Sequence, residues 1–343
     1  MANERRYQLQ SEEANRQLET LVAGLGVHPE TSQYYAQMLT TVLKLFEDGA
    51  DVGDLKIANS ALKELRYAFK VFSQYRTVPK VTVFGSARTP PDHAITLQAN
   101  DFGRGMVEAG WMVITGAGSG VMGGAQAGAG REQSFGLNIR LPFEQEANPW
   151  IAEDPKLITF KYFFTRKLFL LKESAAACFL PGGFGTCDEV FEVLTLIQTG
   201  KTSMIPVLLL DIPGGGYWKA WDAYVREEMV GRGFIAPEDV HLYRVTETVE
   251  DAGREILEFY RVFHSHRFVG EDLVLRIHRP LNPEALEALG REFQDILKGP
   301  VLSLPGPLPA EDDEWPELPR LILSFNRTGY GRLRQLIDFI NLS

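Results

Sequence analysis

The chain has 343 residues, of which 45% are hydrophobic, so it can form one large domain or two ordinary ones with a sizeable core. Its formal charge of −10 at pH 7 argues against binding along a nucleic-acid polymer, although a local basic pocket for one nucleotide is compatible with it. The charged N-terminus and the lack of an apolar run of membrane-spanning length predict a cytoplasmic protein without a membrane segment.

Apolar residues recur every three or four positions from about residue 10 to residue 75, a spacing that predicts helices. From residue 80 onward, short β-rich runs alternate with helical stretches. These runs are KVTVFGSA, WMVITGAG, FGLNIRLP, KLITF, AACFLPGG, MIPVLLLD and HLYRVT. Near-continuous apolar strands separated by helices predict a parallel sheet covered on both faces, which is a Rossmann-like, doubly wound α/β fold.

The last part of the chain, beyond about residue 268, repeats none of the central glycine motifs. The run EDLVLRIHRP precedes a helical stretch, and a second apolar run, RLILSF, precedes another one after a proline-rich acidic segment. We therefore expect two β-α units there. The predicted organisation is a helical N-terminal extension over 1–77, a Rossmann-like domain over 78–265 and a small C-terminal α/β appendage over 266–343.

Neither the cysteines nor the histidines show the spacing of a metal site. Cys178 and Cys187 are nine residues apart and form no CxxC pair, which also argues against a disulfide framework. His264 and His266 could pair on a metal, but no acidic or cysteine partner is near them, so we expect them in an exposed linker. We predict a protein of a reducing compartment that uses neither a metal nor a cofactor.

Three loops rich in glycine follow predicted strands and should meet at one edge of the sheet, because ligands of open parallel sheets bind outside the carboxyl ends of the strands. The loops are Gly85-Ser86-Ala87, Gly116-Ala117-Gly118-Ser119-Gly120 and Gly182-Gly183-Phe184-Gly185-Thr186. The third loop opens a helix, and the unpaired N–H groups and dipole of a helix start suit a phosphate. The second loop has Val121 where a dinucleotide motif requires its third glycine, which disfavours an NAD-dependent enzyme.

Glu189 has two interpretations that the pattern leaves open. Residues Thr186 to Glu189 fit the S/T-x-x-E capping box, in which Glu189 would bind the backbone N–H of Thr186 and only stabilise the helix start. Alternatively, the helix dipole would lower the pKa of Glu189 and keep it ionised beside a bound phosphate sugar, where it could activate water or stabilise positive charge. Arg166, in the preceding helical stretch, is likewise either a solvated surface residue or a functional one.

The motifs resemble those of a known family. The run Thr165-Arg166-Lys167, followed after one strand by PGGFGTCDE over 181–189, is similar to the signature of the LOG ("lonely guy") family, an RK pair and PGGxGTxxE. The segments GSA and GAGSGVMGG resemble that family's nucleotide-binding loops, and the resemblance covers about residues 78 to 250.

The resemblance implies a phosphoribohydrolase that cleaves nucleoside 5'-monophosphates into a free base and ribose 5-phosphate as a homodimer or higher homo-oligomer, without metal or cofactor. It assigns catalysis to Arg166 and Glu189. It assigns phosphate or nucleotide binding to the remaining matched residues: Gly85, Ser86, Gly118, Gly120, Met122, Lys167, Gly182, Gly183, Gly185 and Thr186.

The segments before and after the central region affect which substrate the resemblance favours. Longer bacterial relatives with flanking domains act on purine and pyrimidine nucleotides, so a general substrate such as AMP is favoured over a cytokinin nucleotide. The alternative function is a non-catalytic protein that binds or carries a nucleotide or the molybdenum cofactor. The label "lysine decarboxylase", often given to such sequences, is disfavoured because no lysine stands in a recognisable pyridoxal phosphate setting.

Overall fold

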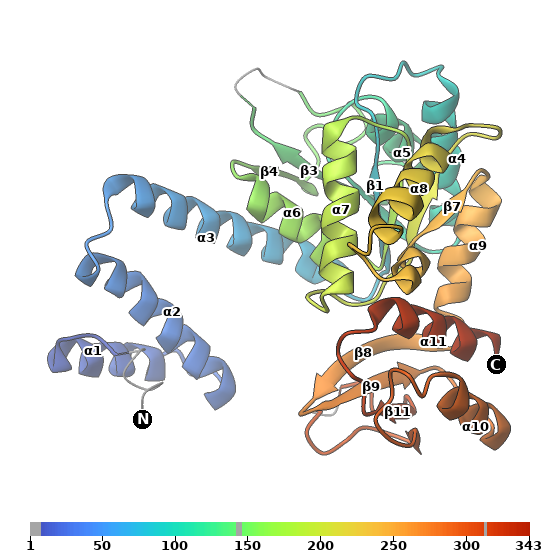
Figure 1. The fold of residues 1–343 in the computed structure, drawn as a ribbon. Helices are drawn as coiled ribbons and strands as arrows, with labels where there is room; N and C mark the ends of the chain where they lie inside the picture. The colour runs from blue at the N-terminus through green and yellow to red at the C-terminus, as the bar shows by residue number, and fades with distance from the viewer. Residues whose placement is uncertain (1–7, 142–145, 312–313) are drawn as a thin grey trace. The chain divides into compact units, whose positions relative to one another are not determined.

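The computed structural model describes residues 8–141, 146–311 and 314–343 (Figure 1). The first seven residues of the expected N-terminal extension, Pro142 at the end of the run FGLNIRLP, and residues 312–313 of the proline-rich segment lie outside them. The chain forms two compact units, one up to Tyr67 and one from Ala68 to Ser343. No helix among the described residues is long and apolar enough to cross a membrane.

The first unit is helical, as predicted. It contains α1 (Glu12–Ala23), α2 (Pro29–Glu47) and most of α3 (Val52–Phe72). The Ser11 hydroxyl accepts a hydrogen bond from the Ala14 N–H and caps α1, and a proline opens α2, where its missing N–H costs nothing. Leu9, Leu18 and Val22 form a small buried cluster with residues of α2 packed against it.

The second unit is built on a parallel sheet. In the described residues its seven strands are β1 (Lys80–Phe84), β2 (Met112–Thr115), β3 (Ser134–Ile139), β4 (Leu157–Phe160), β5 (Ala176–Phe179), β6 (Val207–Leu210) and β7 (Arg244–Thr246). Their order is β4-β3-β2-β1-β5-β6-β7, with every pairing parallel. The predicted doubly wound α/β fold is confirmed. The chain order reverses between β1 and β5, which is where such sheets bind ligands.

Helices cover both faces of this sheet (Figure 1). The helices are α4 (Ala94–Glu108), α5 (Val121–Ala129), α6 (Phe163–Lys172), α7 (Phe184–Gln198), α8 (Tyr217–Tyr224) and α9 (Val249–Phe259). Successive side chains of β5 point to opposite faces. Cys178 packs in a cluster with α4, α5 and α9, whereas Ala177 and Phe179 pack in a cluster with α7 and α8.

The C-terminal part forms a second, antiparallel sheet of order β10-β11-β9-β8. Its elements are β8 (Phe263–Val269), β9 (Asp272–Ile277), α10 (Pro283–Glu292), β10 (Leu302–Leu304), β11 (Arg320–Leu323) and α11 (Tyr330–Leu342). The two expected β-α units are present as β9–α10 and β11–α11. The sequence did not predict β8 or β10, and the expected domain boundary after residue 265 falls within β8.

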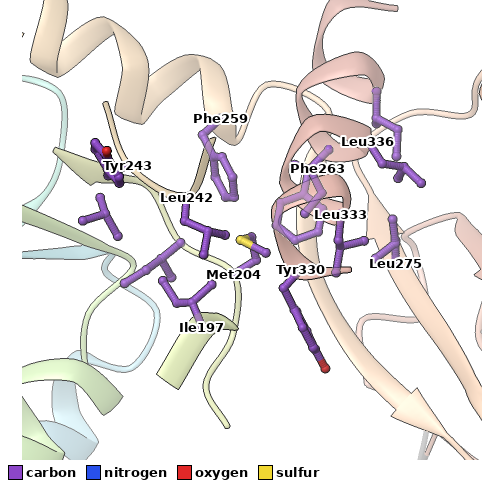
Figure 2. Close-up of a cluster of buried hydrophobic side chains, with 14 of the residues drawn as sticks. Ile197, Met204, Leu242, Tyr243, Phe259, Phe263, Leu275, Tyr330, Leu333 and Leu336 are labelled. Atoms are coloured by element: carbon purple, nitrogen blue, oxygen red, sulfur yellow. The ribbon is translucent and has the colours of Figure 1, made fainter. Parts of the chain in front are cut away.

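One hydrophobic core joins the two sheets. Figure 2 shows Ile197 of α7 and Phe259 of α9 near Leu333 and Leu336 of α11 and Leu275 of β9, and all belong to the same buried cluster. Continuous burial of this kind fixes the C-terminal sheet against the parallel sheet, since separating them would expose these side chains to water.

The histidines of β8 correct a prediction. His264 and His266 do not lie in an exposed linker, because both belong to β8. The His266 Nε2 accepts a hydrogen bond of 2.9 Å from the Met204 N–H, and burial lowers the pKa of His266 to about 4. No group of three or more metal-binding side chains occurs among the described residues.

Candidate functional site

A pocket of about 870 Å³ lies at the carboxyl ends of the parallel strands, where the three glycine loops meet. Most of the residues predicted from the sequence line it: Gly85, Ser86, Gly118, Met122, Arg166, Gly182, Gly183, Gly185, Thr186 and Glu189. Gly120 and Lys167 are outside its described lining. The fold thus brings together residues that are up to about a hundred positions apart in the sequence.

The loops after β1 and β5 touch each other, and glycine is required at the contact. The Ser86 N–H donates to the Pro181 carbonyl at 3.1 Å. A Cβ on Gly182 would lie 2.1 Å from the Thr186 Oγ1 and 2.9 Å from the Ser86 nitrogen, closer than atoms can approach. Glycine at position 182 therefore permits the close approach of the two loops.

Gly120 supports the loop after β1. It has a φ of +62°, and a Cβ there would lie 2.3 Å from the Ser86 carbonyl oxygen. The next residue, Val121, donates its N–H to that same oxygen at 2.9 Å. Gly120 therefore shapes the pocket through Ser86 and does not line it.

The start of α7 excludes the capping-box interpretation. The helix begins at Phe184 with Gly183 as its N-cap, and no side chain caps it. Thr186 and Glu189 consequently lie inside the helix, and the Thr186 N–H donates to the Gly183 carbonyl at 3.0 Å. The N–H groups of this helix start belong to the glycine loop of the pocket, and binding of a phosphate there stays a prediction.

Glu189 lies in the second turn of α7 with only 8% of its surface exposed. Burial raises the pKa of Glu189 to about 7, and the positive charges of Lys167 and Arg166 offset only part of that rise. The expectation that the helix dipole would lower this pKa is wrong, because loss of water around the carboxylate outweighs it. A carboxyl group with a pKa near 7 is suited to accept a proton at neutral pH.

Lys167 is held by three carboxylates of α7. Its ammonium lies 2.6 Å from Asp188 Oδ2 and 3.7 Å from Glu189 Oε1, and it also binds Glu192 closely. Burial alone would lower the pKa of Lys167, but the hydrogen bonds to Asp188 and Glu192 raise it above its usual value. Lys167 is therefore a fixed positive charge beside Glu189 and outside the described lining of the pocket.

Arg166 is anchored to the backbone of β3. Its Nε donates to the Leu137 carbonyl at 2.7 Å. Its guanidinium lies close to Gly116, because a Cβ added to Gly116 would lie 2.2 Å from the Arg166 Nη2. Burial lowers the pKa of Arg166, and the nearby charge of Glu189 opposes this effect. Arg166 and Glu189 thus face one pocket from two different helices.

The sequence reasoning missed several residues at the pocket. The Tyr217 hydroxyl, at the start of α8, donates to the Gly182 carbonyl at 2.6 Å and lies 3.4 Å from the Cys187 Sγ. The buried Asn148 amide donates to the Gly118 carbonyl at 3.0 Å and so holds the second glycine loop. No motif links these positions to the loops, because only the fold brings them together.

Three further lining residues lie at strand ends: Arg88 comes four residues after β1, and Asn138 and Ile139 are the last two residues of β3. Their positions beside strand ends are a signal that could have found them, since all loops at this edge of the sheet converge.

Comparison with solved structures returns proteins of low identity. A molybdenum cofactor carrier protein from Chlamydomonas reinhardtii is 23% identical with a TM-score of 0.38, over 53% of this chain and 97% of that one. A molybdenum cofactor binding protein from Rippkaea orientalis is 19% identical with a TM-score of 0.37, over 51% of this chain and 93% of that one.

Comparison with protein families and with curated proteins gives matches to part of the chain. Residues 120–256 match the family model described as "Possible lysine decarboxylase". A cytokinin riboside 5'-monophosphate phosphoribohydrolase of Mycobacterium tuberculosis is 29% identical over 170 residues, which are 48% of this chain and 87% of that protein. The enzyme of the same name, LOG1, from Arabidopsis thaliana is 38% identical over 77 residues, which are 22% of this chain and 34% of that protein.

The matches span less than half the length of the plant relatives, and the segment matched by the family model contains the RK pair and the glycine loop after β5. Together with the curated relatives, the family model confirms the resemblance to the LOG family that the motifs predicted.

Proposed function

We propose that this protein hydrolyses the N-glycosidic bond of nucleoside 5'-monophosphates and releases a free base and ribose 5-phosphate. The observation that carries the proposal is that Arg166 and Glu189 line the same pocket as the glycine loop at the start of α7. A phosphate bound on that loop would place its ribose within the pocket, beside the Glu189 carboxyl group.

The proposed reaction needs a group that accepts a proton and stabilises positive charge. The oxygen of a water molecule forms a bond to the anomeric carbon while the bond from that carbon to the base nitrogen breaks. The electron pair of the broken bond goes to the base, which takes a proton from solvent, and one water proton goes to Glu189. The ionised carboxylate also stabilises the oxocarbenium character that develops on the ribose.

Arg166 has the position to orient the sugar. Its Nε is already bound to Leu137, so its remaining N–H groups are held in one orientation within the pocket lining. A guanidinium fixed in this way can donate to ribose hydroxyls and reduce the entropy lost when the reacting groups align. The role proposed for Arg166 is therefore orientation of the ribose.

A decarboxylase that uses a lysine Schiff base is not supported by the site. None of the described residues that line the pocket is a lysine. Lys167, which stands behind Glu189, has a raised pKa because it binds Asp188 and Glu192, whereas a lysine nucleophile must lose its proton. The family label and the chemistry of this pocket therefore differ.

The finer assignments form part of the same proposal. The favoured substrates are purine nucleotides such as AMP, with pyrimidine and cytokinin nucleotides as further candidates. A homodimer or higher homo-oligomer in the cytoplasm is the proposed assembly. The alternative, a protein that binds or carries a nucleotide or the molybdenum cofactor without reaction, leaves the buried carboxyl group of Glu189 without a role, because binding a phosphate needs no carboxylate beside the sugar.

The test is release of free base from a panel of nucleoside 5'-monophosphates, with ribose 5-phosphate measured in the same samples. The panel contains AMP, GMP, CMP, UMP and one cytokinin nucleotide. We expect release by the wild type, a loss of about 100-fold or more in Glu189→Gln, and no change in Glu287→Gln, whose side chain is exposed on α10. The absence of release from every monophosphate, with nucleotide binding intact by calorimetry, would refute hydrolysis in favour of a binding protein.

A further inference from the structure

The phosphate of the proposed substrate needs positive charge that the family motifs do not supply here. A phosphate monoester carries a charge of roughly −1.5 to −2 at neutral pH. The glycine loop after β5 offers backbone N–H groups and a helix dipole, which are equivalent to about half a positive charge. The nearby carboxyl groups of Asp188 and Glu189, both in the pocket lining, oppose a second anion. A further cation near the glycine loop would therefore strengthen phosphate binding.

The two cations of the RK motif are both committed elsewhere. Lys167 binds Asp188, Glu189 and Glu192 and is outside the described lining of the pocket. Arg166 is bound to Leu137 of β3. Its guanidinium lies beside Gly116 in the loop after β2, and in the order β3-β2-β1-β5 that strand is two strand spacings, about 10 Å, from the strand that carries the phosphate loop.

Arg88 lies on the side of the pocket that carries the phosphate loop. It follows the loop after β1, the strand that pairs directly with β5, and it lines the pocket together with Gly182 and Gly183. Its backbone N–H donates to the Ser86 Oγ at 3.1 Å, and Ser86 itself is bound to Pro181 at the start of the phosphate loop. The backbone at Arg88 is thus tied to the phosphate loop by two consecutive hydrogen bonds.

The guanidinium of Arg88 is also available to bind a phosphate. The residue is exposed, and within the described part of the chain its side chain has no ion pair or hydrogen bond. An arginine left unpaired at the mouth of a pocket can form two parallel hydrogen bonds with phosphate oxygens, which is the geometry that its planar side chain matches best.

We propose that Arg88 binds the 5'-phosphate of the substrate and thereby sets the preference for nucleotides over nucleosides. This inference rests on the proposed function, because it places the phosphate on the loop at the start of α7. Arg88 then supplies binding energy remote from the bond that breaks, and Lys167 keeps its separate role behind Glu189.

The kinetic test compares Arg88→Gln and Arg88→Lys with the wild type. We expect Arg88→Gln to raise the KM for AMP by about 10- to 100-fold with kcat changed by less than about threefold, because a charged hydrogen bond to the phosphate is lost. Arg88→Lys should recover part of the affinity because it keeps the charge. Turnover of adenosine, which has no phosphate, should be equal in wild type and Arg88→Gln. The matched control is Arg279→Gln, an exposed arginine outside the pocket lining, which should behave as the wild type.

A binding test keeps this inference separate from the proposed reaction. Calorimetry with ribose 5-phosphate, which has no bond to cleave, should give an affinity about 10-fold or more weaker in Arg88→Gln than in wild type or Arg279→Gln. If no monophosphate is hydrolysed but this loss is seen, the reaction is refuted and the role of Arg88 stands. If the wild type releases base and Arg88→Gln binds ribose 5-phosphate and AMP with unchanged affinity, the inference is overturned while the reaction stands.

Discussion

The ammonium of Lys167 lies 3.7 Å from the Glu189 carboxylate, and its closest partners are Asp188 and Glu192 on the same helix. This arrangement places one positive charge among three carboxyl groups, of which only Glu189 is deeply buried. Lys167 lowers the pKa of Glu189, but burial raises it further, so the two effects leave that pKa at about 7. The two residues of the RK pair thus differ in position. Arg166 lines the pocket, whereas Lys167 is outside its described lining and lies beside the Glu189 carboxyl group.

The first prediction concerns the pH dependence of the reaction. Glu189 must be ionised to accept a proton, so kcat/KM should fall as the pH decreases below about 7, the pKa of this group in the free protein. Lys167→Met removes a charge that lowers this pKa and leaves Asp188 and Glu192, which raise it. The acid limb of kcat/KM should therefore shift to a pH about 1 unit higher in Lys167→Met. In Lys167→Arg it should stay close to the pH of the wild type. An acid limb at the same pH in Lys167→Met and the wild type would show that Lys167 does not tune Glu189.

The second prediction concerns stability. The folded-state pKa of Glu189 is raised above the unfolded value of 4.5, so between these two pH values the folded protein binds more protons than the unfolded one. The free energy of unfolding should consequently decrease as the pH rises through this range, by up to on the order of 3 kcal/mol from this group. Glu189→Gln removes the cost of a buried charge.

Thermal unfolding at pH 5 and pH 8 measures the effect. Glu189→Gln should raise the Tm at pH 8 more than at pH 5, relative to the wild type at each pH. Glu287→Gln, on the exposed surface of α10, serves as the control and should change neither value. An equal change in Tm at both pH values would contradict a raised pKa for Glu189.

The third prediction concerns Gly116, which leaves room for the Arg166 guanidinium. A Cβ at Gly116 would lie 2.2 Å from the Arg166 Nη2 and 2.9 Å from the Met122 Sδ, and both atoms are ends of flexible side chains. Gly116→Ala should therefore displace Arg166 without unfolding the protein. We expect kcat/KM to decrease by about 100-fold, the usual effect of a displacement of about 1 Å at a reacting centre.

The control for this variant is Gly123→Ala. Atoms around a Cβ at Gly123 would be no closer than 3.6 Å, which is ordinary contact, so activity and Tm should remain close to the wild type. If Gly116→Ala has full activity while its Tm is unchanged, the position of Arg166 does not matter for the reaction.

Much of the parallel sheet could be predicted from local sequence. Each of the seven β-rich runs contains one observed strand, because buried parallel strands are apolar throughout and the helices between them show a different period. The glycine loops were predictable as well, since a loop at a strand end needs the small residues that the sequence contains there. The nine-residue motif with its RK pair was sufficient to indicate the family.

The antiparallel C-terminal sheet was only partly predictable. The strands β9 and β11 precede clear helical patterns, whereas β8 follows α9 almost directly and β10 has only three residues. The pairing of β9 with β11 joins residues 44 to 50 positions apart, and no local pattern specifies such a pairing. The position of this sheet against α7 and α9 depends on the shared core in Figure 2.

The sequence by itself determined the resemblance to the LOG family, the parallel sheet and most of the glycine loops at its edge, because those properties depend on local patterns and on the order of strands. Only the tertiary structure decided what Glu189 and Lys167 do. The pattern allowed Glu189 to be a helix cap or an ionised carboxylate of low pKa, but the helix starts two residues before Thr186 and the carboxyl group is buried. A pKa depends on the water and the charges around a group in space, and neighbours in the sequence do not specify these.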